Sequence, residues 1–237
     1  MTDDTDGGIG PVDLVSTRGD LDAPGPASLS SPQSRRTSPP PTLLAYALMG
    51  VMGFGGLSAL VAAMGGILDV GTGALDGDAG DAMLLIVGGL LMVGGLGQML
   101  GVMLGLLLLA IWTGLAVSTY QKATADSVGH SAIFAGLSYF ICFVNFVVPH
   151  QVMTRLWERT TEYDIENPME ATPAWVKLWW PLWLAANLLG RAATGVSETE
   201  IGVLDVASSA TFALTAAMTV FLVKSLQSRL EAVVEAA

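Results

Sequence analysis

The sequence predicts an all-α membrane protein: a polytopic membrane helix bundle with four crossings, one re-entrant or half-membrane segment and a disordered N-terminal tail. Composition predicts the class, because 52% of the 237 residues are hydrophobic and 13% are charged, against roughly 25% charged in soluble domains. Long uncharged stretches predict the crossings, since about 20 apolar residues span the hydrocarbon core of a bilayer. One short, interrupted apolar run, residues 133–148, predicts the segment that does not cross; five crossings are the alternative.

Charge and cysteine content exclude several classes of function. The chain has 21 acidic and 10 basic residues and a formal net charge of −11. It therefore lacks the basic patch that binds phosphates, and no nucleic-acid partner is expected. The single cysteine, Cys142, excludes a disulfide within the chain and a cysteine-based metal cluster. No cofactor or metal is expected, and membrane lipids are the expected partners.

The first 40 residues are predicted to be a disordered cytoplasmic tail. They are rich in Asp, Ser, Thr, Gly and Pro, so they cannot bury enough apolar surface to offset the entropy of ordering. Residues 41–229 follow as the helical membrane domain, and residues 230–237 as a C-terminal helical tail. Within that domain, the uncharged stretch Leu43–Leu68 is the first predicted crossing.

The second uncharged stretch, Ala82–Gln121, is about twice as long as one straight crossing requires. Either it is one long helix or it folds back near Gly94, and one helix is favoured because no polar turn interrupts it. Gln98 on this helix is expected to hydrogen-bond across a helix interface. Small residues spaced four apart predict close helix packing and leave room for a helix partner or a homo-oligomer. They are Gly55 and Ala59 in the first stretch and Gly97, Gly101 and Gly105 in the second.

The run 133–148 is short for a crossing, contains Asn145 and is closed by Pro149. These features predict a turn at membrane depth, which is tolerated only where protein or a water cavity satisfies the backbone. Pro149–Tyr163 then has apolar residues on one helical face and Arg155 and Arg159 elsewhere. This pattern predicts an amphipathic helix lying in the bilayer interface, with the two arginines reaching lipid headgroups.

Two further crossings complete the chain. Trp175–Gly190 is predicted to be a short crossing that is kinked or opened at Pro181, because proline lacks the backbone N–H of a helix. Val206–Val223 is the last crossing, and its threonines are expected to bond to the helix backbone or to a neighbouring helix.

Positive charge in short loops predicts the orientation. Arg35 and Arg36 place the N-terminus in the cytoplasm. If residues 133–148 re-enter rather than cross, the basic residues of the later loops and of the tail lie on the same side. Both termini of this multi-pass cell-membrane protein are therefore expected in the cytoplasm.

Two motifs carry a resemblance to a known family. The first is Asn145-x-x-x-Pro149-x-x-x-Met153-x-x-Leu156-Trp157, and the second is Trp179-Trp180-x-x-Trp183. Together they resemble the bacterial and archaeal membrane proteins catalogued as domain-of-unknown-function family 4328. The resemblance covers about Leu43 to Arg229, and implies a multi-pass membrane protein without implying an activity.

The favoured function is a non-enzymatic module for assembly, sensing or lipid contact, and the alternative is a small transporter or channel with a polar site near Asn145 and Asn187. An enzyme is not expected, because no His-Glu-x-x-His or Gly-x-Ser-x-Gly motif and no paired intramembrane Asp occurs. Tryptophans at such positions most often anchor helices at the bilayer interface, which is the alternative to a ligand or packing role. The candidate structural or ligand-contact residues are Asn145, Pro149, Arg155, Trp157, Arg159, Trp179, Trp180, Trp183 and Asn187.

Overall fold

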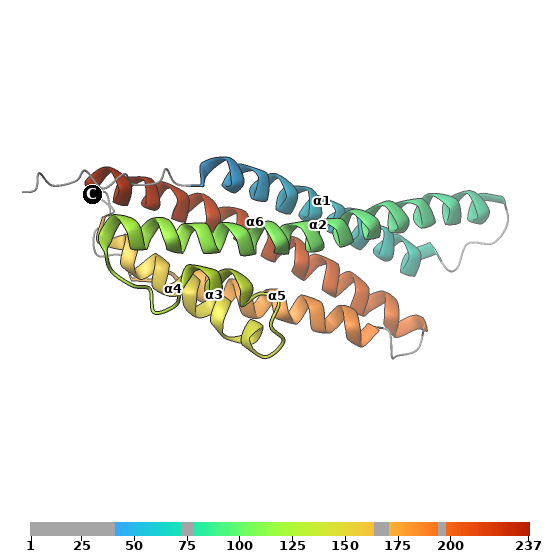
Figure 1. Ribbon diagram of the computed structural model, residues 1–237. Helices are drawn as coiled ribbons and strands as arrows, with labels where there is room; N and C mark the ends of the chain where they lie inside the picture. The colour runs from blue at the N-terminus through green and yellow to red at the C-terminus, as the bar shows by residue number, and fades with distance from the viewer. Residues whose placement is uncertain (1–40, 73–77, 164–170, 194–197) are drawn as a thin grey trace, which may run out of the picture. The chain divides into compact units, whose positions relative to one another are not determined.

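The computed structural model describes residues 41–72, 78–163, 171–193 and 198–237, and every regular element in these ranges is a helix. The N-terminal tail predicted for residues 1–40 lies outside them. The helices belong to one compact unit, residues 36–237. In chain order they are α1 (Thr42–Thr72), α2 (Asp78–Thr124), α3 (Ala132–Leu137), the 3-10 helix η1 (Val144–Phe146), α4 (Val148–Thr161), α5 (Ala174–Ala193) and α6 (Glu198–Ala236) (Figure 1).

Within the described ranges, three helices are long and apolar enough to cross a membrane: Thr42–Leu68 of α1, Asp81–Thr124 of α2 and Gly202–Ala236 of α6. Their outer faces carry large apolar side chains such as Leu43 (85% exposed) and Leu85 (80% exposed). Apolar exposure on this scale is unfavourable in water and natural in lipid. The prediction that the second uncharged stretch is one long helix is confirmed, because α2 runs without a break past Gly94.

Helices α1 and α2 pack along a line of small residues. Gly55 lies against Gly101, so closely that a Cβ added to Gly55 would stand 2.9 Å from the Gly101 Cα. Along the same seam Gly97 faces Ser58 and Gly105 faces Met52, and Ala59 is fully buried. The absence of side chains at these glycines lets the two backbones approach, which increases van der Waals contact where lipid supplies no hydrophobic drive.

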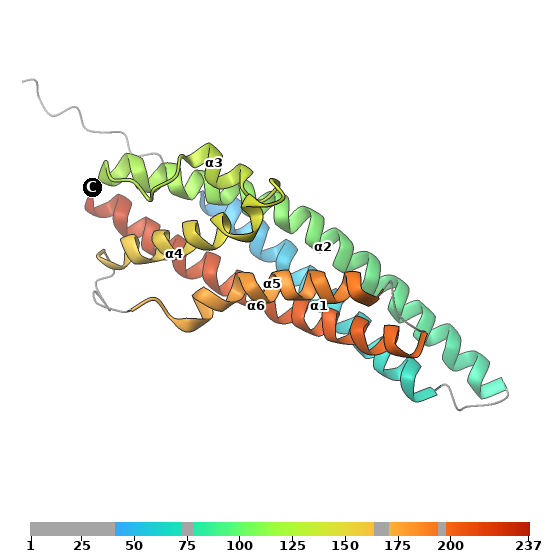
Figure 2. The same ribbon diagram turned by 90° about the horizontal axis from the view of Figure 1, so that it is seen from below.

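The segment between α2 and α4 is a hairpin rather than a single helix. The hydroxyl of Ser131 accepts a bond from the backbone N–H of Phe134 (3.3 Å) and caps α3. Six-residue α3 is about 9 Å long at ~1.5 Å per residue, far too short to span a bilayer. After η1 the chain reverses, and α4 returns toward the end of the bundle where α2 ends (Figures 1 and 2).

The structure corrects one expectation for α4. The helix forms where it was predicted, with Pro149 in its first turn, where a missing backbone N–H disrupts no helical bond. Its apolar face, however, does not rest in a bilayer interface: Val152, Met153 and Leu156 are fully buried in the same core as side chains of α2, α5 and α6. An amphipathic pattern reports that one face is apolar, and it does not report whether lipid or protein covers that face.

Helix α5 contains Pro181 in its interior. Because proline has no N–H, the carbonyl of Lys177 loses its helical hydrogen bond, as the sequence indicated. Helix α6 continues without interruption from the last predicted crossing through the predicted tail. The threonines of α6 bond to its own backbone, as expected: Thr211 to Ala207 O (2.7 Å) and Thr219 to Thr215 O (2.7 Å).

The start of α1 lies beside the end of α6. The Gln227 Nε2 donates to the Thr42 Oγ1 over 3.1 Å, and the Trp112 Nε1 on α2 donates to the Gln227 Oε1 over 3.3 Å. These two bonds place the beginning of α1, the later part of α2 and the end of α6 at the same end of the bundle, called the Gln227 end below.

Candidate functional site

The apex of the hairpin is held by a tryptophan of α5. The Trp180 Nε1 donates to the backbone carbonyl of Asn145 over 2.9 Å. The ring of Tyr139 meets Trp180 edge-on (5.5 Å between centroids, 90°), and the ring of Trp183 stacks on Trp180 (4.7 Å, 8°). Backbone that is not helical needs such a donor at membrane depth, where water is absent. The structure therefore brings together three predicted residues, Asn145, Trp180 and Trp183.

A second bond ties the hairpin to α2. The hydroxyls of Thr113 and Tyr139 lie 3.1 Å apart, and both side chains are buried. Glycine allows the two helices to meet there, since a Cβ on Gly136 would stand 2.8 Å from the Ala110 carbonyl. The hairpin is thus clamped between α2 on one side and α5 on the other.

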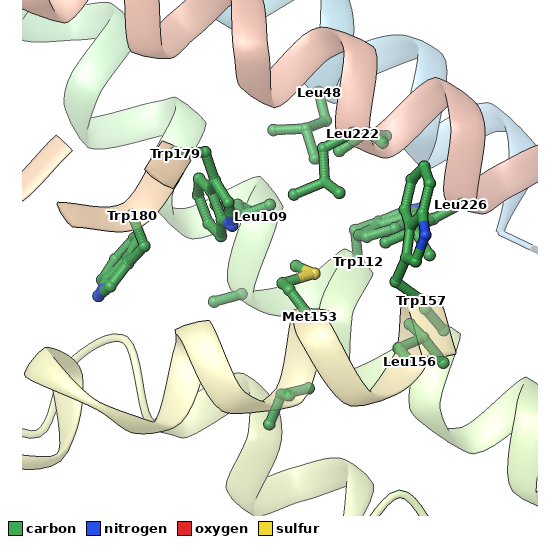
Figure 3. Close-up of a cluster of buried hydrophobic side chains, with 14 of the residues drawn as sticks. Leu48, Leu109, Trp112, Met153, Leu156, Trp157, Trp179, Trp180, Leu222 and Leu226 are labelled. Carbon is green, nitrogen blue, oxygen red and sulfur yellow. The ribbon is translucent and has the colours of Figure 1, made fainter. Parts of the chain in front are cut away.

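Buried tryptophans form the centre of this region, here called the Trp cluster: Trp112, Trp157, Trp179, Trp180 and Trp183. Figure 3 shows the first four of them. Trp112 and Trp179 have no exposed surface, and Trp179 and Trp180 pack with their centroids 5.0 Å apart. Because the rings are enclosed by protein, the expectation that they serve as single interface anchors does not describe their packing. Fully buried rings contribute large contact areas, with favourable quadrupole contacts between tilted and offset pairs.

A cation lies over the Trp157 ring of the cluster. The guanidinium carbon of Arg229 stands 4.1 Å from the ring centroid, and Trp175 meets the same indole edge-on at 5.4 Å. The Arg229 Nη1 also donates to the Thr161 Oγ1 over 2.6 Å. Arg229 is only 8% exposed, and a desolvated guanidinium over tryptophan is a strong cation–π arrangement. This contact joins α4 to the end of α6.

The two predicted arginines of α4 bind the loop between α2 and α3. Arg159 forms an ion pair with Asp126 (2.8 Å) in which both side chains are about half exposed, 49% and 45%. The Arg155 Nη1 donates to the backbone carbonyl of Val128 over 3.4 Å. An exposed ion pair contributes little, on the order of 0.2–1 kcal/mol. These contacts position the loop, and they differ from the expected contact with lipid headgroups.

Among the cavities identified in the described residues, none is lined by both Asn145 and Asn187. The Nδ2 group of Asn187 donates to the Trp183 carbonyl one turn earlier on α5 (2.8 Å). Asn187 lines a cavity of about 480 Å³ with Gln98, Arg191 and Ser208, and Asn145 is not among its lining residues. The side-chain Oδ1 of Asn145 is buried without a partner among the described residues. Of the two asparagines, Asn187 is therefore the one that lines a described cavity together with other polar side chains.

An apolar groove runs between α2 and α3 on the outside of the hairpin. It has a volume of about 490 Å³ and opens widely to the surroundings of the bundle. Its lining is aliphatic and aromatic apart from one hydroxyl group: Leu107, Ala110, Ile111, Gly114, Leu115, Ser118, Ala132, Ile133, Gly136, Leu137 and Phe140. Such a groove offers dispersion contacts to a hydrocarbon chain and almost no hydrogen-bond partner.

Sequence reasoning missed the contributions of Tyr139, Gln227 and Arg229. Tyr139 lies inside the short apolar run 133–148 and was not a candidate residue. Gln227 and Arg229 were assigned to the end of the membrane domain without a partner. The sequence feature that could have indicated a packing role for Gln227 and Arg229 is the apolar stripe Leu222, Leu226, Leu230 and Val233. These four side chains are fully buried and continue the core beyond the last predicted crossing. The described residues contain no group of three or more metal-ligating side chains.

Comparison with known families gives one match. The family model described as Domain of unknown function (DUF4328) matches residues 82–228, which include most of α2, all of α3 to α5 and most of α6. No curated protein and no solved structure matches the chain.

Proposed function

The chain belongs to the family described as Domain of unknown function (DUF4328), and from this premise we propose that it is a non-enzymatic membrane module that contacts lipid. The proposal rests on one observation: the hairpin, which is held against α2 and α5, forms an apolar groove with α2 that is open to the surroundings of the bundle. The partners proposed are membrane lipids, with a helix of another protein or a second copy as a further partner along the glycine-rich outer face of α2.

The proposed topology has four crossings, formed by α1, α2, α5 and α6, and one re-entrant hairpin formed by α3 and α4. It is supported by the return of α4 toward the end of α2 and by the ion pair between Arg159 and Asp126 across the hairpin mouth. Lys122, in the last turn of α2, and Arg229, near the end of α6, lie toward the Gln227 end of the bundle. The positive-inside rule assigns the end that carries these basic residues to the cytoplasm. The proposed location is the cell membrane, with both termini cytoplasmic.

Cysteine labelling tests this topology in a Cys142→Ala background. A cysteine at Ala125, in the loop after α2, and one at Ala171, before α5, are both expected to react with a membrane-impermeant maleimide from the cytoplasmic side only. Both positions are exposed, so neither should be hidden by protein. A cysteine at exposed Ala192, near the other end of α5, is the matched control and should react only from outside. Labelling of Ala125→Cys and Ala171→Cys from opposite sides would establish five crossings.

The groove between α2 and α3 is proposed to hold one acyl chain of a membrane lipid. Ile133 (76% exposed) and Leu137 (53% exposed) form its outer rim, and Ser118 supplies a hydroxyl on the α2 side. A hydrocarbon chain would replace the side-chain packing that this face of the hairpin lacks. No charged group lines the groove, so selectivity for a headgroup is not part of the proposal.

Photo-crosslinking tests the groove. Phosphatidylglycerol carrying a diazirine in its acyl chain is expected to crosslink to α2 and α3 residues of the groove. Ser118→Phe fills the groove and should reduce this crosslinking about tenfold, since the bulky ring competes for the same space. Met92→Phe is the matched control, because Met92 is 64% exposed on α2 and does not line the groove. Equal crosslinking of the two variants would refute the acyl-chain site.

A small transporter or channel is the second candidate function, and one observation favours it. Gln98, in the interior of α2, lines two polar cavities between the helices. Polar residues that line cavities inside membrane bundles commonly mark a solute pathway.

A further inference from the structure

A crevice lies between α2 and α5 in the half of the bundle away from the Gln227 end. It is the cavity of about 480 Å³ to which α2 contributes Gln98 and Met99, α5 contributes Asn187, and α6 contributes Ser208 and Phe212. Helices α2 and α5 pack on α6 rather than on each other, so α6 forms the floor of the crevice. Toward the Gln227 end, the hairpin fills the space between α2 and α5 (Figure 2). The space beyond the hairpin is called the α2–α5 crevice below.

Two successive serines of α6 hold the walls of the α2–α5 crevice. The Ser209 Oγ donates to the Gln98 Oε1 on α2 over 3.2 Å, and the Ser208 Oγ donates to the Ala186 carbonyl on α5 over 2.8 Å. Both serines are buried. Because the two bonds start from adjacent residues, Gln98 and Asn187, the neighbour of Ala186, lie at the same height on opposite walls.

These hydrogen bonds also fix what the two amides offer. The Gln98 Oε1 is occupied by Ser209, so the Nε2 group remains as a donor that meets no acceptor among the described residues. Asn187 has the opposite sense, because its Nδ2 donates to the Trp183 carbonyl over 2.8 Å. Its Oδ1 is an acceptor to which no described residue donates. Both side chains are half-buried, and the crevice therefore presents one amide donor and one amide acceptor.

The height of the two amides corresponds to the boundary between headgroups and acyl chains. Arg191 lies four residues beyond Asn187 on α5, and Asp205 lies four residues before Ser209 on α6, which is about 6 Å toward the same end of the bundle in each case. Both charged side chains are exposed, and exposed charges are not tolerated in the hydrocarbon core. The headgroup layer is roughly 5–8 Å thick on each side, so the amides lie at its inner edge.

We infer that the α2–α5 crevice binds a phospholipid whose headgroup carries a hydrogen-bond donor, such as ethanolamine or glycerol. The Gln98 Nε2 donates to a phosphate or ester oxygen, and the N–H or O–H of the headgroup donates to the Asn187 Oδ1. An acyl chain lies along the apolar part of the lining, at Met99 and Phe212. A choline headgroup has no donor and leaves the asparagine oxygen unpaired, which lowers its affinity.

This inference rests on the proposed membrane location and goes beyond the proposed acyl-chain site. The groove between α2 and α3 is a different surface and has no selectivity for a headgroup. In the proposed topology, the α2–α5 crevice lies in the outer leaflet.

Native mass spectrometry of the full chain in mild detergent tests the inference. The protein is titrated with phosphatidylethanolamine, phosphatidylglycerol or phosphatidylcholine of identical acyl chains, and the affinity for the first bound lipid is measured. The ethanolamine and glycerol lipids should bind about three- to tenfold more tightly than the choline lipid, because one hydrogen bond distinguishes them.

Two substitutions separate the roles of the amides. Asn187→Leu should reduce the preference over phosphatidylcholine to about one and leave the affinity for phosphatidylcholine unchanged. Gln98→Met should weaken all three lipids by about three- to tenfold and keep the preference, because every phospholipid has the oxygen that it loses. Gln151→Met is the matched control, since Gln151 is also half-buried but lies on α4 and does not line the crevice. The preference is a ratio within one variant, so partial unfolding cannot imitate its loss.

Four results would overturn the inference. The first is equal affinity of the wild type for the three lipids, and the second is an unchanged preference in Asn187→Leu. The third is a preference for phosphatidylglycerol alone, which would show recognition of charge. The fourth is displacement of the lipid by free glycerophosphoethanolamine at equal concentration, which would show a soluble ligand. Ser118→Phe should keep the preference, and its loss there would assign the preference to the groove between α2 and α3.

Discussion

Gly101→Leu is expected to prevent α1 and α2 from packing and to yield little folded protein. A Cβ at Gly101 would overlap the backbone of Gly55, which has no flexible side chain that could move away. The two helices would have to separate, and overpacking against backbone lies at the unfavourable end of its usual range, about 3 kcal/mol or more. The measurement is the SDS concentration at which the purified protein unfolds, together with its monodisperse yield in mild detergent.

Gly88→Leu is the matched control for this experiment. Gly88 is on the same helix, and a Cβ there would meet nothing within 4 Å. Replacing a helical glycine by leucine should even raise helix stability by roughly 0.5–1 kcal/mol. An unfolding midpoint of Gly101→Leu equal to that of the wild type would contradict the seam as the contact that joins α1 to α2.

Trp180→Ala is expected to release the hairpin from α5. The substitution removes a ring that is 1% exposed, its contacts with Tyr139 and Trp183 and the hydrogen bond to the Asn145 carbonyl. Truncation of a buried tryptophan typically costs about 3–5 kcal/mol. The free energy of unfolding should therefore fall by roughly that amount in a detergent titration.

The lone cysteine reports the same event locally. Cys142 is exposed near the apex, and loosening the hairpin should increase its rate of reaction with N-ethylmaleimide. Trp180→Phe keeps an aromatic ring but removes the donor, so it should lose only about 1–3 kcal/mol for the unsatisfied carbonyl. Leu178→Ala, at a position 53% exposed on the same helix, should change neither quantity. Wild-type stability in Trp180→Ala would show that the hairpin does not depend on this indole.

These experiments connect packing to function because the two proposed sites depend on different parts of the bundle. The lipid groove requires the hairpin to stand against α2, which Trp180 and the Thr113–Tyr139 contact secure. The polar cavities require α1, α2, α5 and α6 to hold their spacing around Gln98. A variant that releases the hairpin should therefore lose acyl-chain crosslinking.

Local properties of the sequence were sufficient to predict the helices. Uncharged length predicted α1 and the unbroken α2, and small residues at a spacing of four marked the surface where Gly55 meets Gly101. The Asn145 and Pro149 interruption indicated a turn. Each of these signals depends on a few residues that are close together in the chain, so it can be recognised in a single sequence.

Burial was decided by the tertiary structure. Leu85 (80% exposed) and Val87 (1% exposed) lie two residues apart on α2, and nothing in their chemistry distinguishes them. Around a soluble helix, water requires one polar face, and the pattern of hydrophobicity then identifies the buried face. Around a helix in lipid, the exposed and the buried faces are both apolar, and this information disappears.

The same reason explains the residues that were misjudged. The apolar face of α4 was assigned to the bilayer interface, and Arg229 and Gln227 were given no partner. Contacts between segments far apart in the chain produce no periodic pattern in the sequence, so they could not be predicted from it. The sequence by itself determined an all-helical membrane bundle with a break at Asn145–Pro149. Only the packing of α2 and α5 decided that this break becomes a clamped hairpin, and only the packing of α5 and α6 against α2 decided that Gln98 lines polar cavities.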